Sequence, residues 1–371
     1  AANNVAGNLL PPDPFFTYTY SRFFRDRINP GRAYVIGEYV YSSSFEFGEG
    51  WASRDVYPYL PVMEALPNLY PFAGGARPSF HLITSGNAQN LRNLSAYVNG
   101  EQVVTKDMNY FAGLDTTVGF STGNLGAATD SVKVFNLASV ASDRMVVHGY
   151  EITYPRQFNF GGASRFEFNL TASASGNYLE IANFNTGGAA PVLYDLTNGA
   201  RYMGDVASPG LVRFVLPAGG SRQLVLLSMA APEIRTVTTL SQRTFNDLSD
   251  VSKQGDYLII SNNRLYTGPS GNPIENYRMY RASSAGGGFN ARSYDIDELV
   301  DQFAFGIKRH PLSVKNFLRY ARAKFAVKPR FVFLMGRGVN YNESRPREAY
   351  PGTNYIDLIP TFGSPGSDNI L

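Results

Sequence analysis

The sequence predicts a mainly β protein that ends in an α/β segment. Up to about residue 245, short runs of β-branched and aromatic residues are separated by turn-forming Gly, Asn and Pro. Regular spacing of short strands is typical of antiparallel sandwiches. From Asp256 onward, buried-strand patterns alternate with helical patterns, which indicates strand–helix–strand units with parallel strands. We therefore expect β-sandwich domains followed by an α/β part.

The first strands follow a segment that is expected to be irregular. Residues 1–30 contain Pro11, Pro12 and Pro14 and lack a clear period. Strands are predicted at 32–41, 79–84, 94–103, 131–135 and 145–154. Asn99-Gly100 predicts a hairpin within the third of these, since a type I′ turn needs positive φ at both positions. On 145–154, alternation places Val147, Gly149, Glu151 and Thr153 on one face and Val146, His148, Tyr150, Ile152 and Tyr154 on the other.

A second series of strands predicts another sandwich. The strands are expected at 165–170, 178–181, 192–196, 211–216 and 223–227, with a tight turn at Asn198-Gly199. Residues 230–250 are expected to form a linker. We therefore predict three domains: a jelly-roll-like β-sandwich at 1–158, a second β-sandwich at 159–245 and an α/β domain at 246–371.

The α/β segment begins with a buried strand at 256–261. A helix is predicted at 272–281, with Pro273 in its first turn, and a short strand at 291–294. Two further helices are expected at 296–303 and from Pro311 onward, before a last strand at 331–335. That strand runs into Gly336-Arg-Gly338. Open parallel sheets bind ligands at the carboxyl ends of their strands, so this is where we expect a site.

Composition excludes several classes of function. The net charge of +3 is too small to indicate a nucleic-acid-binding protein. The chain has 0 cysteines, which excludes a disulfide, a thiolate metal site and a cysteine nucleophile within it. No run of about 18 apolar residues predicts a transmembrane helix. The first residues lack the charged and apolar regions of a signal peptide. We expect the sequence to be a fragment of a longer protein.

Several segments resemble a known family. They are 256–260, 294–306, 314–320, 331–336 and 359–369 in the last third, and 47–51, 150–156 and 193–197 before it. Together they are similar to the gingipain-type cysteine peptidases of family C25, and within that family to the sortases of the type IX secretion system. The resemblance implies a caspase-like (gingipain-like) α/β domain, of which residues 246–371 would form the truncated first half.

The resemblance also implies an activity. The family has a catalytic His in a Gly-His-Gly turn and a catalytic Cys at a later strand end, both after the position that matches Ser367-Asp368-Asn369. This chain has no Cys, and His81, His148 and His310 stand in no such turn. Both catalytic residues are therefore expected beyond this chain, and none is assigned within it. The parent protein would be a cysteine endopeptidase and transpeptidase that acts through a thioester.

The implied partners follow from that activity. The substrates would be exported cargo proteins, whose C-terminal sorting domain is removed and whose new end is attached to the cell surface. An outer-membrane β-barrel and other surface subunits of the secretion system would be further partners. The expected location is the extracellular face of the outer membrane of a Bacteroidetes-type bacterium. No nucleic-acid partner is expected.

The resemblance implies no required cofactor, but gingipain-type domains hold calcium. Asp368 is the candidate metal ligand on that ground, and a turn-stabilising contact of its carboxylate is the alternative role. The family often has Gly-Asp-Gly where this sequence has Gly336-Arg337-Gly338. The arginine removes a carboxylate ligand from that position.

Structural roles are expected for most other polar and aromatic residues. His81 and His148 lie on predicted strands, His310 precedes a helix as a polar cap, and Trp51 is expected in a core. A solvated helix face is expected from Asp295, Asp297, Glu298 and Asp301. Two other functions stay open. One is a non-catalytic protein that docks an outer-membrane partner, and the other is a carbohydrate-binding or adhesin-like β protein.

Overall fold

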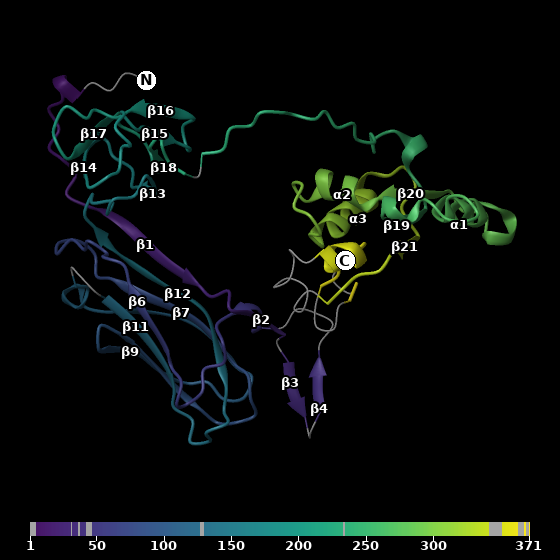
Figure 1. Cartoon of the computed structure of the whole chain (residues 1–371), viewed down its shortest axis with the longest axis horizontal. Coiled ribbons are helices and arrows are strands. Elements are labelled where there is room, and N and C mark those ends of the chain that lie inside the picture. Colours follow the sequence, from purple (N-terminus) through teal and green to yellow (C-terminus); the bar gives the residue numbers. More distant parts are fainter. Residues whose placement is uncertain are drawn as a thin grey trace. The chain divides into compact units, whose positions relative to one another are not determined.

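The computed structural model describes residues 5–30, 32–35, 38–41, 47–126, 130–232, 234–340, 351–362, 367, 368 and 371. The chain divides into two compact units, one of Ala1–Phe24 with Ser53–Leu240 and one of Arg25–Ala52 with Ser241–Leu371 (Figure 1). The first unit is built of strands, and the second contains the α/β part, so the predicted fold class is confirmed. The domain boundaries predicted at 158 and 245 stay predictions. Every helix in the described residues is too short or too polar to cross a membrane.

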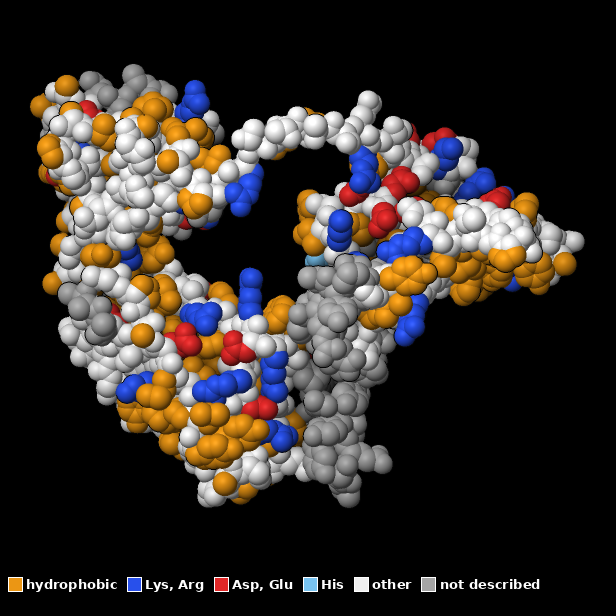
Figure 2. Space-filling view, viewed as in Figure 1, with side chains coloured by type: hydrophobic (Ala, Val, Ile, Leu, Met, Phe, Trp, Pro, Cys, Tyr) orange, Lys and Arg blue, Asp and Glu red, His pale blue; other side chains and the backbone are white. Residues whose placement is uncertain are grey.

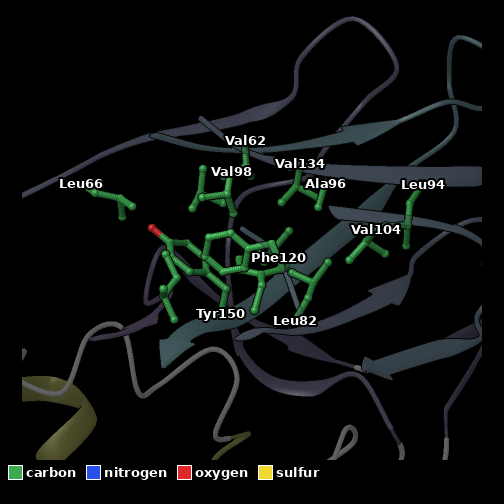
Figure 3. Close-up of a cluster of buried hydrophobic side chains, with 14 of the residues drawn as sticks. Val62, Leu66, Leu82, Leu94, Ala96, Val98, Val104, Phe120, Val134 and Tyr150 are labelled. Carbon is green, nitrogen blue, oxygen red and sulfur yellow. The ribbon is translucent and has the colours of Figure 1, made fainter. Parts of the chain in front are cut away.

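Two antiparallel sheets form the first sandwich. One has the strand order β1 (Phe16–Phe23), β12 (Met145–Arg156), β7 (Ser79–Gly86) and β10 (Gly113–Gly119). The other has the order β6 (Val62–Leu66), β11 (Asp130–Asn136), β8 (Asn93–Val98) and β9 (Glu101–Asp107). Apolar side chains from both sheets meet in one buried cluster, which includes Leu82, Phe120 and Tyr150 (Figure 3). Burial of this cluster is the main stabilising contribution to the sandwich.

Strand β1 corrects the expectation that residues 1–30 are irregular. Its sequence alternates aromatic residues with Thr and Ser, and Phe16 is buried while Thr17, Thr19 and Ser21 are exposed. The strand pairs antiparallel with β12 over its whole length. The prolines that suggested irregular structure all lie before Phe16, so they do not interrupt the ladder.

A β-bulge changes the predicted faces of β12. The pairing with β7 shifts register between Val147 and Gly149. Because of the extra residue, Val147 and Tyr150 both belong to the core, whereas simple alternation placed them on opposite faces. His148 lies in the bulge, where its Nε2 is 2.9 Å from the Ser85 hydroxyl.

The predicted hairpin turn is confirmed. Asn99 has φ of 47° and Gly100 has φ of 84°, as a type I′ turn requires. The strand predicted at 32–41 is instead two strands, β3 (Arg32–Val35) and β4 (Glu38–Tyr41), which pair with each other. Strands β2 (Arg27–Pro30) and β5 (Glu49–Ala52) form a second two-stranded ribbon. Trp51 lies on β5 and is 40% exposed, so the expected core position is wrong.

The second group of sheets in the first unit holds a separate core. Its strand order is β13 (Arg165–Leu170), β18 (Arg222–Leu227), β15 (Val192–Asp195) and β16 (Ala200–Met203), with β14 (Asn177–Ala182) and β17 (Leu211–Leu216) forming a two-stranded sheet. Phe16 of β1 enters this core, 5.3 Å from the Phe168 ring. The Arg156 guanidinium lies over the rings of Tyr18 and Phe166, 5.0 Å from each centroid. These contacts connect the two cores within the unit.

A buried ion pair fixes the loops of the first sandwich. Arg92 Nε donates to Asp143 Oδ2 at 2.7 Å, and both side chains are fully buried. Arg92 also donates to the backbone carbonyls of Ala88, Met108 and Tyr110. Burial alone would raise the pKa of Asp143, but hydrogen bonds from Arg92, Asn136 and Asn90 outweigh it and lower the pKa.

The second unit contains a parallel sheet with helices on both faces. Its strand order is β20 (Ala291–Asp295), β19 (Tyr257–Ser261) and β21 (Phe331–Met335), and both pairings are parallel. Helix α1 (Pro273–Ala282) packs on Tyr257 and Ile259. Helices α2 (Ile296–Phe303) and α3 (Leu312–Lys324) pack on Leu258 and Ile260. The predicted order of these elements is confirmed.

The remaining helices are short. Helix α5 covers Pro351–Ile356. Single 3₁₀ turns form at η1 (Val5–Gly7), η2 (Thr122–Asn124), η3 (Val251–Lys253), η4 (Asn263–Leu265) and η5 (Ser284–Gly286). The start of α1 is set by Asn272, whose Oδ1 accepts from the backbone of Ile274 at 3.0 Å and of Glu275 at 3.2 Å.

Removal of one side chain of the buried Arg92–Asp143 pair should strongly destabilise the fold. We predict that Arg92→Ala lowers the free energy of unfolding by about 3–5 kcal/mol, because Asp143 is left buried and charged. Arg165→Ala is the matched control, since Arg165 pairs with Glu167 at the surface, and should cost less than about 0.5 kcal/mol. Urea denaturation measures both. Equal losses for the two variants would contradict this account of the pair.

The pH dependence of stability should report on His81. Its Nε2 is 2.7 Å from Asp115 and its Nδ1 is 3.1 Å from Glu151. The hydrogen bond to Asp115, and then that to Glu151, raise the pKa of His81 against the effect of partial burial. Stability from a raised pKa is present below the unfolded value of about 6.5 and is lost as pH rises through the folded value. His81→Gln should therefore destabilise more at pH 5.5 than at pH 8.5 in urea titrations. A loss that is the same at both pH values would show that the pair of carboxylates does not act on the imidazole.

Candidate functional site

The three parallel strands end together at one edge of the sheet. Strand β19 ends at Ser261, β20 at Asp295 and β21 at Met335. Loops that follow such ends form the ligand sites of open α/β sheets. A cavity of about 300 Å³ lies beside this edge, between Asn262, the start of α2 and residues 357–360. We take this cavity as the candidate functional site and name it the edge cavity.

Charged side chains of both signs line the edge cavity. The cations are Arg243, Arg264, Lys308 and Arg309, and the carboxylates are Asp297, Asp301 and Asp357. Arg309 Nε is 3.3 Å from Asp357 Oδ2, and both of these side chains are largely buried. Arg243 Nη1 is 2.9 Å from Asp301 Oδ2 at a more exposed position. Arg264 Nη1 donates to the Tyr355 carbonyl oxygen at 2.7 Å.

These pairs hold the walls of the cavity together. The Arg309–Asp357 pair joins the loop after α2 to the segment that follows α5, and Arg264 joins η4 to α5 itself. Side chains fixed in this way can present charge to a ligand with little loss of conformational entropy on binding. The mixture of signs suits a polar ligand with both donor and acceptor groups, such as a peptide backbone.

The predicted acidic face of α2 is only partly a solvated face. Asp295 is the helix cap: its Oδ1 accepts from the backbone of Asp297 at 2.8 Å and of Glu298 at 3.4 Å. Burial raises the pKa of Asp295, although these backbone hydrogen bonds oppose the effect. Glu298 accepts from the backbone and side-chain nitrogens of Asn246, at 2.5 and 2.8 Å. It thereby fixes the segment before β19 against the helix.

Gly336-Arg337-Gly338 has a structural explanation. The Arg337 carbonyl oxygen accepts from the backbone of Leu358 at 2.8 Å and of Ile359 at 3.0 Å. A Cβ on Gly336 would lie 2.7 Å from the Ile359 side chain, and one on Gly338 would clash with Thr361. The glycines therefore allow residues 358–361 to pack directly on the end of β21. Sequence reasoning missed this contact, because it joins segments about twenty residues apart.

The predicted metal ligand and the three histidines lie as follows. Asp368 is exposed, and its carbonyl oxygen accepts from the backbone of Leu371 at 2.9 Å. In the described residues no three or more His, Asp and Glu side chains are arranged to hold a metal ion, so calcium at Asp368 stays a prediction. His310 Nδ1 accepts from the backbone of Leu312 at 3.1 Å, which is the capping role expected of it. His81 and His148 lie in the first unit and do not contribute to the edge cavity.

Comparison with known proteins identifies relatives of the second unit and of the whole fold. The family model of peptidase family C25 matches residues 250–371. The crystal structure of dimeric latent PorU from Porphyromonas gingivalis is similar over 97% of this chain, with a TM-score of 0.58 and 12% identity. The match covers 34% of that chain, so this sequence spans about a third of the length of PorU. At this identity the likeness shows a shared fold.

Other solved structures match more weakly. The CBM36-1 domain of a multidomain xylanase from the hindgut metagenome of Trinervitermes trinervoides has a TM-score of 0.24 at 11% identity, covering 36% of this chain and 96% of that one. A carbohydrate-binding module CBM36 in complex with calcium and xylotriose has a TM-score of 0.22 at 9% identity, covering 30% and 97%. Scores this low support no conclusion about function. No curated protein matches the chain.

The observed order of parallel strands and helices agrees with the family match over the same residues. The resemblance drawn from the sequence is thereby confirmed. Residues 250–371 match the model of peptidase family C25, the gingipain-type cysteine peptidases, in a chain that shares its fold with PorU.

Proposed function

We propose that this chain is a fragment of a type IX secretion sortase, with its catalytic Cys and His on later segments of the same peptidase domain. The observation that carries the proposal is that the apolar side chains of β21 are exposed. Phe331, Val332 and Phe333 are 46%, 41% and 37% exposed, although the equivalent residues of β19 are buried. Among the described strands β21 pairs with β19 alone. Figure 2 shows apolar side chains gathered along α1 and β21.

An apolar strand of a parallel sheet is normally covered on both faces and paired on both sides. The exposed side of β21 therefore supports the addition of further strands and helices of the family C25 domain. Those strands would also end at the edge that carries the edge cavity. A nucleophile at a later strand end would then face the same cavity, in keeping with the position of ligand sites in open sheets.

The chemistry proposed is acyl transfer. A cysteine thiolate attacks the peptide carbonyl before the sorting domain of an exported protein, and the C–N bond breaks as the amine of the sorting domain leaves with a proton. The amino group of a surface acceptor then attacks the thioester, a new amide bond forms and the thiolate is released. A neighbouring His would serve as the base and acid for these proton transfers.

In this proposal the residues of the edge cavity help to orient the substrate. Arg309 and Asp357 fix residues 357–360, which form one wall of the cavity. The partners would be exported cargo with C-terminal sorting domains and outer-membrane subunits of the secretion system. The site of action would be the extracellular face of the outer membrane.

A variant of this wall tests the proposal. In the longer protein that carries this chain, Arg309→Ala should lower kcat/KM for cleavage of a sorting-junction peptide by roughly tenfold, because the substrate-orienting wall loses its ion pair. Arg319→Ala, an exposed position on α3, is the matched control and should leave kcat/KM unchanged. Mass spectrometry of the products, with an added amine acceptor, measures both cleavage and transfer.

The outcomes separate the possible functions. Release of the sorting domain together with a new amide to the acceptor supports a sortase. Release followed only by hydrolysis would limit the function to that of a peptidase. If the protein neither cleaves the junction nor reacts with a thiol-directed substrate analogue, the catalytic proposal fails and a docking role remains.

A further inference from the structure

Three turns meet at one end of the sheet that contains β8, β9 and β11. They are the Asn99-Gly100 hairpin turn, the loop that follows η2, and the start of β11 at Asp130. Asn99 connects them. Its Oδ1 accepts from the backbone of Ser131 at 2.7 Å, which fixes the orientation of the amide. Its Nδ2 then faces the Asn124 carbonyl oxygen, at 2.5 Å, and Asp130 Oδ1.

The Asp130 carboxylate is buried at this junction. The residue is 2% exposed. Its Oδ1 accepts from the backbone of Gly126 at 2.6 Å as well as from Asn99. Its Oδ2 has no hydrogen-bond partner in the described part of the chain. Oδ1 is thus held between the hairpin turn and the loop that follows η2. A buried carboxylate oxygen without a partner is costly, and such a group requires an explanation.

A second carboxylate belongs to the same hydrogen-bond network. Glu101 is half-buried at the start of β9, and its Oε2 accepts from the Asn124 side-chain amide. Elsewhere in the first unit, buried carboxylates form ion pairs with arginines. Asp143 pairs with Arg92, and Asp195 pairs with Arg222 at 2.5 Å. In the described residues neither Asp130 nor Glu101 forms an ion pair with Lys or Arg. In the described residues both carboxylates therefore accept from amide groups alone.

We infer that this junction binds a calcium ion. Asp130, Glu101 and the Asn124 carbonyl oxygen supply hard oxygen ligands, and water molecules complete the shell. Calcium takes 6–8 oxygen ligands in flexible geometry at about 2.3–2.6 Å, which suits oxygens from three separate turns. The ion supplies the missing partner of Asp130 Oδ2 and balances both charges. Magnesium requires a tighter octahedral arrangement and gives up its water reluctantly, so it fits this site less well.

This site is independent of the peptidase proposal. It lies in the first unit, outside the segment that matches family C25, and it differs from the calcium ligand predicted at Asp368. Its effect is to fasten the β8–β9 hairpin and the η2 loop to β11. Because the unfolded chain does not hold these oxygens together, bound calcium stabilises the folded state by mass action.

The test measures calcium binding by the 371-residue chain directly. The protein is freed of metal with a chelator, and calcium chloride is titrated by calorimetry, with magnesium chloride as the comparison. Thermal unfolding is followed in the same solutions. We expect a single equivalent of calcium to bind and to raise Tm, and magnesium to have a much smaller effect. Asp130→Asn should abolish the response. Glu101→Gln should raise Kd by at least about tenfold, since it removes one charged ligand.

Two controls define the site. Asp368→Asn removes the other predicted ligand, and Glu167→Gln removes an exposed carboxylate on β13. Both variants should bind calcium as the original chain does. The inference is overturned if millimolar calcium gives neither heat nor a change in Tm, or if Glu101→Gln binds with unchanged Kd. It is also overturned if Asp368→Asn alone removes binding. Because Glu101 is partly exposed, Glu101→Gln is expected to fold, and it tests the inference even if Asp130→Asn does not fold.

Discussion

The burial of β19 on both faces is the constraint on which the second unit depends. All five of its residues are buried, and it pairs in parallel on both sides. Parallel neighbours cannot be joined by a tight turn, so each crossover carries helices over a face of the sheet. Helix α1 covers one face, and α2 with α3 covers the other. This arrangement brings all the strand ends to one edge, and the edge cavity follows from it.

Buried arginines in the first unit contact carboxylates, backbone carbonyls or aromatic rings. Arg92 satisfies Asp143 and three backbone carbonyls, and it fixes loops that have no regular structure of their own. Arg156 lies between aromatic rings where the two cores of the unit meet. Such groups add little net stability compared with apolar burial, but they are costly to leave unpaired. Asp130 Oδ2 is buried without a hydrogen-bond partner in the described residues, and a bound cation would supply one.

Much of the fold could be predicted because its signals are local. Asn-Gly at 99–100 specifies a turn by its own backbone preferences, and Pro273 with Asn272 marks a helix start. The bulge at His148 could not be predicted, because it depends on the register of a neighbouring strand. For the edge cavity, the sequence predicted only its position, at the carboxyl ends of the parallel strands. Its Arg309–Asp357 pair joins residues far apart in sequence, and no local pattern indicates such a contact. Trp51 was misplaced because composition does not show which strand residues face a core.

Amide hydrogen exchange of β21 tests the central claim most directly. The 371-residue chain is compared with the longer protein that carries it. The account predicts that the amides of β19 are protected in both, whereas those of β21 that do not bond to β19 exchange rapidly in the 371-residue chain and become protected in the longer protein. Equal, rapid exchange of these β21 amides in the two proteins would contradict the claim that the parallel sheet continues beyond β21.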